Sequence, residues 1–501
     1  MSEKWEKLNQ NVISAIQRGD YEVALADAQA AFEVAEKEKG DGRNMAVSLN
    51  NLGELYHLLG RFDEAEKVLL QSLELFERQN GEQSVEVADA LANLAELYLR
   101  MEQFVEAEEI LLRILAICEK ENLDPLFPLE SLATALLGQG KMSEARSRLE
   151  QALEVGENSF GKDHPDLGEI LKRLGTVEQQ SGNLDGAEKY FRRVLVLYEN
   201  SIGVDHPFFA SILSHLAGIY LARGHFQAAE PLLNQAVGIY RQDSPDGHPE
   251  LAETLEKLAG MYGGLGKREK AEDYQKQAVE MYVAVLGKDH PAVAQAWNSL
   301  GELYLQDKKV VQARKLFNDS LAVREKIFGE NHPAVAQSYN NLGILHSMCG
   351  ERSLAVKQHQ RALKIRKAAF GEQHPAITQS LENLAGLARE SGKLQEAKKY
   401  LLQSLSIWKS AMGQEHPAVA QSLHNLATLE MMAGNNGDAE HMLLEARKIL
   451  EKDRVANEMH LLIVYETLAA LYKTMGRNME AGEFAARIHK IKKPEHMRKR
   501  G

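Results

Sequence analysis

The chain has few cysteines, few aromatic residues and no long apolar run. Its 501 residues include two cysteines, Cys118 and Cys349, which lie far apart in sequence, so we expect no disulfide framework and a reducing compartment. No stretch approaches the ~20 apolar residues that a membrane-spanning helix needs. The N-terminus, from Met1 to Trp5, starts polar and lacks the apolar core of a signal peptide. We therefore predict a cytoplasmic protein without a membrane span.

Positive charge is outnumbered, with 59 lysines and arginines against 72 aspartates and glutamates, so the net charge is -13. An acidic surface repels phosphate groups, which disfavours a large nucleic-acid interface. The exception is the stretch 487–501, which contains seven basic residues and one acid. This basic tail is either a solvated helix end or a contact for an acidic partner or anionic surface.

The histidines and glycines do not form catalytic or metal-binding motifs. Seven of the 17 histidines belong to His-Pro dipeptides spread along the chain, and we interpret them as turn and cap residues. The stretch 263–267 looks like a phosphate loop, but Met261 and Arg268 stand where that loop needs a glycine and a serine or threonine. We expect no enzymatic activity, no cofactor and no metal site.

A period of 42 residues dominates the sequence. A leucine followed by glycine or alanine recurs from Leu52 to Leu468, and an alanine follows 13 residues after each such leucine. One interval is shortened to 38 residues, between Leu94 and Leu132. The His-Pro dipeptides keep the full period and begin at His164, His206, His248, His290, His332, His374 and His416.

Each repeat unit predicts two helices, as the unit that starts at Pro333 illustrates. Proline suits the first helical turn, and Leu342 with its neighbours at helical spacing marks an inward-facing side. Gly350 supplies the permissive backbone of a turn, and a second amphipathic stretch follows it. The small residues Gly343 and Ala355 should let the two helices approach closely.

These units predict an all-α fold, a right-handed superhelical α-solenoid of about twelve helix-turn-helix hairpins. End units must shield such a stack from solvent, and capped ends favour a monomer. We expect a local change of superhelix geometry at the shortened unit. The predicted segments are a degenerate N-terminal capping repeat at 1–40, eleven tandem units at 41–486 with one shortened near 122–128, and the basic tail at 487–501.

The motif Leu52-Gly-Glu-Leu-Tyr56, followed by Gly60-Arg-Phe-Asp-Glu-Ala65, resembles the tetratricopeptide repeat family. The 42-residue length and the triplet Asn340-Asn341-Leu342 resemble more closely its kinesin light chain subclass. The resemblance implies a solenoid that binds other proteins. It also implies that the first helix of each hairpin lines a concave face, which holds a peptide or a partner's helix.

The resemblance further implies peptide contacts at four first-helix positions: five and one residue before the signature leucine, and two and five residues after it. A glutamine and an asparagine four residues apart share one helix face, and a primary amide both donates and accepts hydrogen bonds. A ladder of amides would hold the backbone of an extended peptide without demanding particular side chains. Alternatively, the asparagines cap or bridge neighbouring helices within the stack. The amides at the two positions before the leucine are Asn51, Asn93, Gln295, Gln337, Asn341, Gln379, Asn383, Gln421 and Asn425.

Basic residues occupy the position before the leucine in three consecutive middle units: Arg173, His215 and Lys257. They would form a cationic strip for partners with acidic segments or a C-terminal carboxylate. The alternative is local pairing, since Glu169 and Glu253 lie four residues before Arg173 and Lys257.

We therefore expect a protein–protein interaction scaffold whose partners are proteins or peptides. A second interpretation is a regulatory or adaptor subunit of an enzyme or signalling complex with its catalytic part on another chain. Helical hairpin repeats can also read nucleic acid one base at a time. The acidic balance and the lack of a repeated basic column argue against that role.

Overall fold

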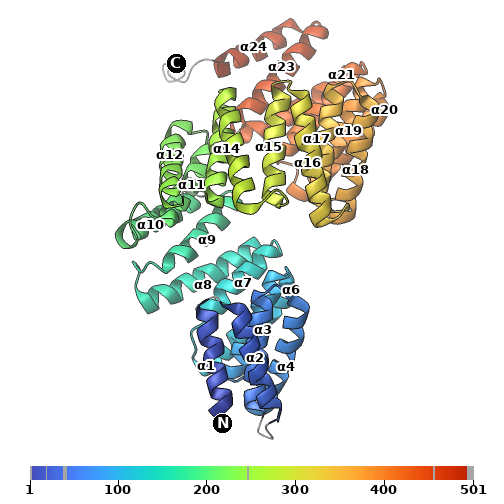
Figure 1. Cartoon of the computed structure of the whole chain (residues 1–501). Coiled ribbons are helices and arrows are strands. Elements are labelled where there is room, and N and C mark those ends of the chain that lie inside the picture. Colours follow the sequence, from blue (N-terminus) through green and yellow to red (C-terminus); the bar gives the residue numbers. More distant parts are fainter. Residues whose placement is uncertain (1–2, 19, 38–41, 245–246, 455–456, 493–501) are drawn as a thin grey trace. The chain divides into compact units, whose positions relative to one another are not determined.

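The computed structural model describes residues 3–18, 20–37, 42–244, 247–454 and 457–492. Over these residues the chain forms α-helices and two short 3-10 segments, and no β-strand occurs among them. The chain divides into two compact units, Met1–Pro245 and Asp246–Gly501, each a stack of helical hairpins (Figure 1). The predicted all-α solenoid is confirmed. None of the described helices combines the length and apolarity required to cross a membrane.

The first unit contains six hairpins, in which odd-numbered helices are the first helices and even-numbered helices the second. Helices contact chiefly their neighbours in chain order and, more sparsely, the next first helix along the stack. The helices are α1 (Glu3–Gln17), α2 (Tyr21–Lys37), α3 (Arg43–Leu58), α4 (Phe62–Asn80), α5 (Val85–Arg100), α6 (Phe104–Glu121), α7 (Leu126–Gly138), α8 (Met142–Phe160), α9 (Leu167–Gln180), α10 (Leu184–Ser201), α11 (Pro207–Ala222) and α12 (Phe226–Asp243).

The second unit repeats this arrangement in six further hairpins. Its helices are α13 (Pro249–Gly264), α14 (Arg268–Leu286), α15 (Pro291–Gln306), α16 (Val310–Phe328), α17 (Pro333–Met348), α18 (Arg352–Phe370), α19 (Thr378–Glu390), α20 (Leu394–Met412), α21 (Pro417–Met432), α22 (Asn436–Leu450), α23 (Glu458–Thr474) and α24 (Asn478–Lys492), with 3-10 segments η1 (Pro375–Ile377) and η2 (Glu451–Asp453).

His-Pro dipeptides start many of the first helices. His332 is the N-cap of α17, and its Nδ1 accepts a hydrogen bond from the Ala334 N–H at 3.1 Å, while Pro333 opens the helix. The interpretation of these histidines as turn and cap residues is confirmed: six are N-caps, and His164 lies in the turn before α9. The same bond is made by His164, His206, His248, His290, His374 and His416.

The turn inside each hairpin requires a left-handed backbone. Gly350 has φ 75° between α17 and α18, as the sequence predicted. Glu102 and Lys308, both with φ 58°, take the equivalent place in two other turns. A side chain in this conformation costs about 1 kcal/mol, which glycine avoids.

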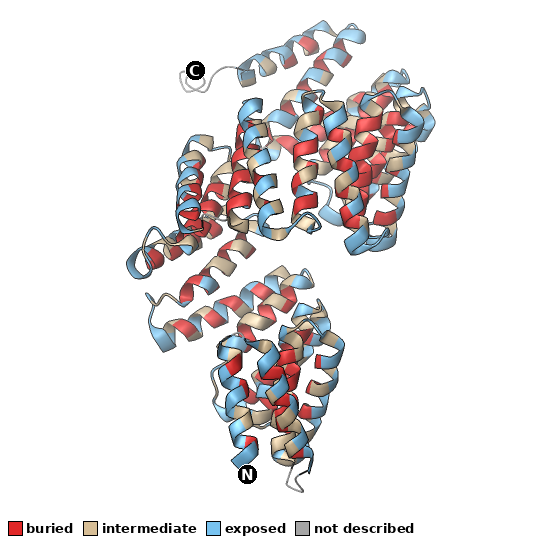
Figure 2. Cartoon of the chain, viewed as in Figure 1, coloured by how far each residue is buried: buried red, intermediate tan, exposed pale blue. Residues whose placement is uncertain are grey.

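Small residues bring the two helices of a hairpin close together. A Cβ added to Gly343 of α17 would lie 2.6 Å from Cε1 of His359 on α18, which is closer than atoms approach. Ala355 of α18 is fully buried, and so is Leu342 of α17 but for 3 % of its surface. Figure 2 shows the general pattern, with buried residues on the helix sides that face other helices and exposed residues on the outer sides.

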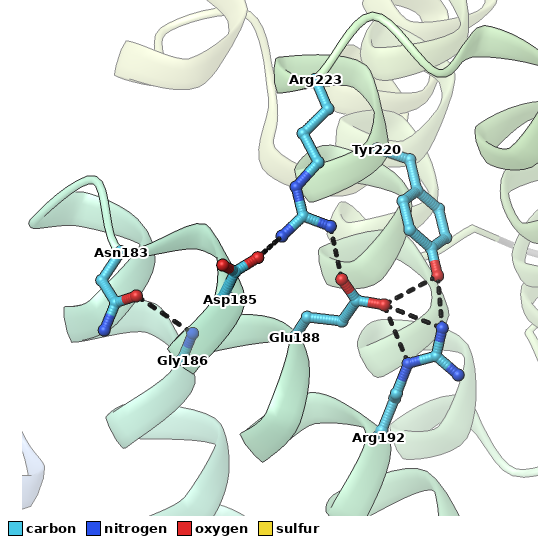
Figure 3. A network of polar contacts seen from close by, with 7 residues as sticks. All are labelled: Asn183, Asp185, Gly186, Glu188, Arg192, Tyr220 and Arg223. Atoms are coloured by element: carbon cyan, nitrogen blue, oxygen red, sulfur yellow. Dashed lines mark hydrogen bonds and ion pairs between the residues drawn. The ribbon is translucent and has the colours of Figure 1, made fainter.

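A recurring polar contact joins one hairpin to the next. Glu188 of α10 accepts a hydrogen bond from the Tyr220 hydroxyl of α11 at 3.1 Å and pairs with Arg192 and Arg223 (Figure 3). The tyrosine is the repeat residue four positions after the leucine, so this part of the motif serves hairpin stacking. Equivalent bonds of 2.8 Å run from Tyr98 to Glu66 and from Tyr472 to Glu440.

The shortened unit keeps both of its helices. Asn122, with φ 55°, ends α6, and α7 begins at Leu126 and has 13 residues. The expected change of superhelix geometry at this point stays a prediction.

The predicted basic tail begins inside a helix, because residue 487 lies within α24. Arg487 donates to Glu451 at 3.1 Å, and Lys492 donates to Glu466 at 2.8 Å. Residues 493–501, with the other basic residues of the tail except Lys490, lie outside the described part of the chain.

Candidate peptide-binding groove

Two adjoining cavities follow the first helices of the second unit. One, of about 500 Å³, lies along α13 and α15, and the other, of about 370 Å³, along α15, α17 and α19. Both are lined by Glu302 and Gln306 of α15, so they adjoin at these residues, and we call the two cavities together the second-unit groove. Among the predicted site residues, four line it: Gln295, Gln337, Asn341 and Gln379.

The groove amides form a chain of hydrogen bonds in which each residue donates to the next. Arg366 Nη2 donates to Gln337 Oε1 at 2.8 Å, and Gln337 Nε2 donates to Asn341 Oδ1 at 3.2 Å. Asn341 Nδ2 then donates to Glu302 Oε1 at 2.9 Å. Burial raises the pKa of Glu302, while the bond from Asn341 and the charge of Arg324 oppose that shift. The chain of bonds therefore runs from a buried cation to a carboxylate.

Two buried arginines hold the oxygen atoms of three glutamines. Arg324 donates to Gln295 Oε1 at 2.6 Å, and Arg366 donates to Gln379 Oε1 at 3.0 Å in addition to Gln337. Only 4 % of Arg324 and 6 % of Arg366 is exposed. With the oxygens engaged, these amides offer a ligand chiefly their Nε2 donors.

The predicted glutamine–asparagine pairs differ from one another. Gln421 Nε2 donates to Asn425 Oδ1 at 3.2 Å, as Gln337 does to Asn341. The shared helix face inferred from a spacing of four is thus real for these two pairs. In the third pair, Gln379 accepts from Arg366, while Asn383 Nδ2 donates to Asn340 Oδ1 on the previous first helix at 2.8 Å.

The asparagines of the early hairpins bridge neighbouring first helices. Asn51 Nδ2 donates to Asn9 Oδ1 at 2.6 Å, and Asn93 Nδ2 donates to Asn50 Oδ1 at 3.1 Å. This is the bridging role stated above as the alternative for such residues. Any additional contact from Asn51 and Asn93 to a bound peptide stays a prediction.

Each of the three basic residues of the predicted strip interacts with residues of its own compact unit. Arg173 donates to Glu169 at 3.3 Å and to Thr134 at 2.9 Å. His215 stacks on Phe191 with 4.9 Å between ring centroids. Burial lowers the pKa of Lys257, and Glu253 opposes that shift. Arg173 and His215 belong to the first compact unit and Lys257 to the second. Local pairing of Arg173 is therefore observed, and a strip that binds acidic segments stays a prediction.

The first unit has a cavity of its own, of about 620 Å³, along α5, α7 and α9. Arg173 lines it together with Arg100 and two acids, Glu96 and Glu130. Burial raises the pKa of Glu130, and the charge of Arg173 opposes this. The cavity is thus lined by charged side chains of both signs.

Sequence reasoning missed the buried arginines. Glu302 stands two residues after Leu300, at one of the implied groove positions, but was not named as a site residue. A signal was present, because Arg324 and Arg366 lie 42 and 84 residues after Tyr282, at the position where Tyr198 and Tyr240 also carry a ring. An arginine at a buried aromatic position breaks the repeat pattern. Among the described residues, no three histidine, cysteine, aspartate or glutamate side chains gather where they could hold a metal ion.

Stacked helical hairpins with a groove along their first helices define the α-solenoid repeat proteins. The family model described as tetratricopeptide repeat matches most of the chain, and the chain belongs to the tetratricopeptide repeat family. Repeats of this family generally mediate protein–protein interaction. The matched stretches are residues 7–78, 44–120, 127–195, 169–242, 250–325, 293–368 and 375–452.

Solved structures similar to this chain include repeat proteins of the kinesin light chain type. BtubC (BKLC) from P. vanneervenii is 26% identical, with a TM-score of 0.39, over 48% of this chain and 93% of that one. A putative kinesin light chain from Podosopora anserina with nearly identical TPR-like repeats is 25% identical, with a TM-score of 0.36, over 41% of this chain and 99% of that one. The search of curated proteins gave no match.

Proposed function

We propose that the protein is an interaction scaffold that binds an extended segment of a partner protein along its first helices. The observation that carries this proposal is the second-unit groove, whose two adjoining cavities follow the helices from α13 to α19 and share the lining residues Glu302 and Gln306. A groove built from one helix of each successive hairpin suits a segment that contacts several repeats in turn. The fold is generally non-enzymatic, which agrees with a binding role.

The lining of the groove suits a peptide backbone with some apolar side chains. The Nε2 groups of the arginine-held glutamines can donate to backbone carbonyl groups of the segment. Leu305, Ile344 and Met348 line the same cavity and offer apolar contact. The segment is an extended peptide or a helix of another protein, as expected from the sequence. The predicted contacts of Asn383, Gln421 and Asn425 would extend the binding surface to the following repeats.

Site-specific photo-crosslinking tests this proposal. A photoreactive residue at Met348, in the groove, should crosslink to partner proteins in the native lysate. The same residue at Val311, on α16 and 80 % exposed, is the matched control outside the groove. The combined substitution Asn341→Ala, Asn383→Ala and Asn425→Ala should weaken the Met348 crosslinks. Equal crosslinking from both positions, unchanged by the triple substitution, would place the binding surface elsewhere.

A further inference from the structure

Arg366 is a buried cation without a counter-ion. Its guanidinium donates to Ser380 Oγ at 3.0 Å and to the oxygens of Gln337 and Gln379. All three acceptors are neutral, and no described carboxylate lies within ion-pairing distance of it. Burial lowers the pKa of Arg366, and no charged neighbour offsets that shift.

The equivalent arginine one repeat earlier has a different environment. Arg324 also donates to a serine hydroxyl, Ser338 Oγ at 3.0 Å, and to a groove glutamine. Its charge, however, interacts with the Glu302 carboxylate, which opposes the effect of burial on the pKa of Arg324. The residue 42 positions after Glu302 is Ile344. Arg366 therefore has an isoleucine where the repeat pattern gives Arg324 an acid.

Open space lies beside that isoleucine. Ile344 lines the cavity of about 370 Å³ together with Gln337 and Gln379, the two glutamines bound to Arg366. The charged residue in the cavity lining is Glu302, while Arg324 and Arg366 lie behind the glutamines whose oxygens they hold. Two buried guanidinium groups thus stand against one carboxylate, which leaves one positive charge uncompensated. A buried charge is costly unless an opposite charge and hydrogen bonds compensate it. An anion in the cavity would compensate the charge of Arg366, as the Glu302 carboxylate compensates the charge of Arg324 one repeat earlier.

We infer that a carboxylate of the bound partner segment, from an aspartate, a glutamate or a C-terminus, occupies the cavity beside Ile344 and compensates Arg366. It accepts a hydrogen bond from Gln379 Nε2, whose oxygen Arg366 already holds. Glu302 does not compete for Arg366, because Asn341 and Arg324 engage it. The inference rests on the proposed function and adds a chemical preference to it. It places acidic recognition at α17 and α19, away from Arg173, His215 and Lys257.

The test uses the full chain and a random library of twelve-residue peptides as the probe. Peptides selected by the wild-type protein should be enriched in acidic residues. Replacing the critical glutamate of a selected peptide by glutamine should weaken binding about tenfold or more, as expected when a buried charge pair loses one partner. Fluorescence anisotropy with the glutamate and glutamine peptides measures this ratio directly.

Substitutions at Ile344 and Arg366 locate the effect. Ile344→Glu supplies an internal counter-ion, so it should abolish the preference for the glutamate peptide and raise the melting temperature relative to Ile344→Leu. Ile344→Leu should keep the preference. Arg366→Met removes the cation without adding an acid, and it should remove the preference too, which keeps the test valid if Ile344→Glu does not fold.

The outcomes separate the inference from the proposed function. Peptides that bind, compete with Met348 crosslinking and show no preference for acids would overturn the inference alone. A preference for acids that survives both Ile344→Glu and Arg366→Met would also overturn it. If no peptide competes with the groove crosslinks and no partner crosslinks there, both the inference and the proposed function are wrong.

Discussion

Tyr220 donates its hydroxyl hydrogen to Glu188 across the boundary between two hairpins, with 3.1 Å between the oxygens. Burial disfavours the charged carboxylate, but hydrogen bonds from Arg223, Arg192 and Tyr220 outweigh it, so the pKa of Glu188 lies below its usual value of 4.5. A carboxylate with a lowered pKa contributes stability above its unfolded pKa and loses that contribution as the pH falls.

Glu188→Gln should therefore destabilise the first unit at pH 7 by about 1 kcal/mol. The difference from wild type should shrink as the pH falls below about 4.5, toward the lowered pKa of the folded state. Urea unfolding at pH 7 and at pH 3 measures both effects. Glu199→Gln, an exposed position on the same helix, is the control and should change neither. Equal pH profiles for the two variants would contradict the prediction.

For Glu256 we expect the opposite change of stability with pH, because its pKa is raised and not lowered. Burial raises the pKa of this carboxyl group on α13, and the neighbouring Glu253 adds to the shift, against hydrogen bonds from Gln275 and Tyr282. A raised pKa means that the folded state loses stability as the pH rises above the unfolded pKa, about 4.3. Glu256→Gln should thus stabilise the second unit at pH 7, and the gain should vanish near pH 4.

Thermal unfolding of Glu256→Gln across this pH range gives the measurement. Glu280→Gln, on the exposed side of α14, provides a control with the same loss of charge. A Glu256→Gln variant that is less stable than wild type at pH 7 would show that the hydrogen bonds to the carboxylate outweigh its burial.

Two helical glycines in the second unit should respond to alanine in opposite ways. At Gly343 the new Cβ would press against His359, so the substitution should cost about 1–3 kcal/mol. At Gly386 of α19 nothing lies within 4 Å of the new Cβ, so the better helix propensity of alanine should add up to about 1 kcal/mol. Denaturant unfolding of the two variants checks the contrast, and a Gly343→Ala protein as stable as Gly386→Ala would refute it.

The His332 cap should tolerate asparagine better than alanine. Asparagine keeps an acceptor for the Ala334 N–H, whereas His332→Ala leaves it unpaired and should cost about 1 kcal/mol. Long repeat arrays do not unfold in one step, so a local probe is appropriate. Amide hydrogen exchange in the first turn of α17 should accelerate in His332→Ala and stay near wild type in His332→Asn. If amide exchange accelerated equally in both variants, the His332 ring would not be the cap of α17.

The hairpins could be predicted from the sequence because their marks are local and periodic. Pro333 at a helix start, Gly350 at a turn and Gly343 at a close approach each act through backbone geometry that one residue type fulfils best. The 42-residue period then repeats these marks in most units. The capping histidines follow from this logic too, since a capping residue such as His206 or His332 directly precedes a proline in the first turn of its helix.

The groove was less accessible to sequence reasoning, because its properties depend on pairs of residues from different helices. The amide positions were identified, but nothing in their spacing shows that Arg366 of α18 holds both Gln337 and Gln379. The Asn383–Asn340 bridge likewise joins residues 43 apart. Only the three-dimensional stacking brings these partners together and decides which amide atoms remain for a ligand.

Because each hairpin contacts chiefly its immediate neighbours, such a chain can gain or lose whole repeats. Excising one unit of 42 residues joins positions that are equivalent in the repeat, so the new neighbours present surfaces of the same kind as the old ones. Gene segments of this type can be gained or lost by unequal crossing-over without creating a new fold. Ligand preference is not protected in the same way, because each unit carries its own groove residues, as Glu302 and Ile344 illustrate.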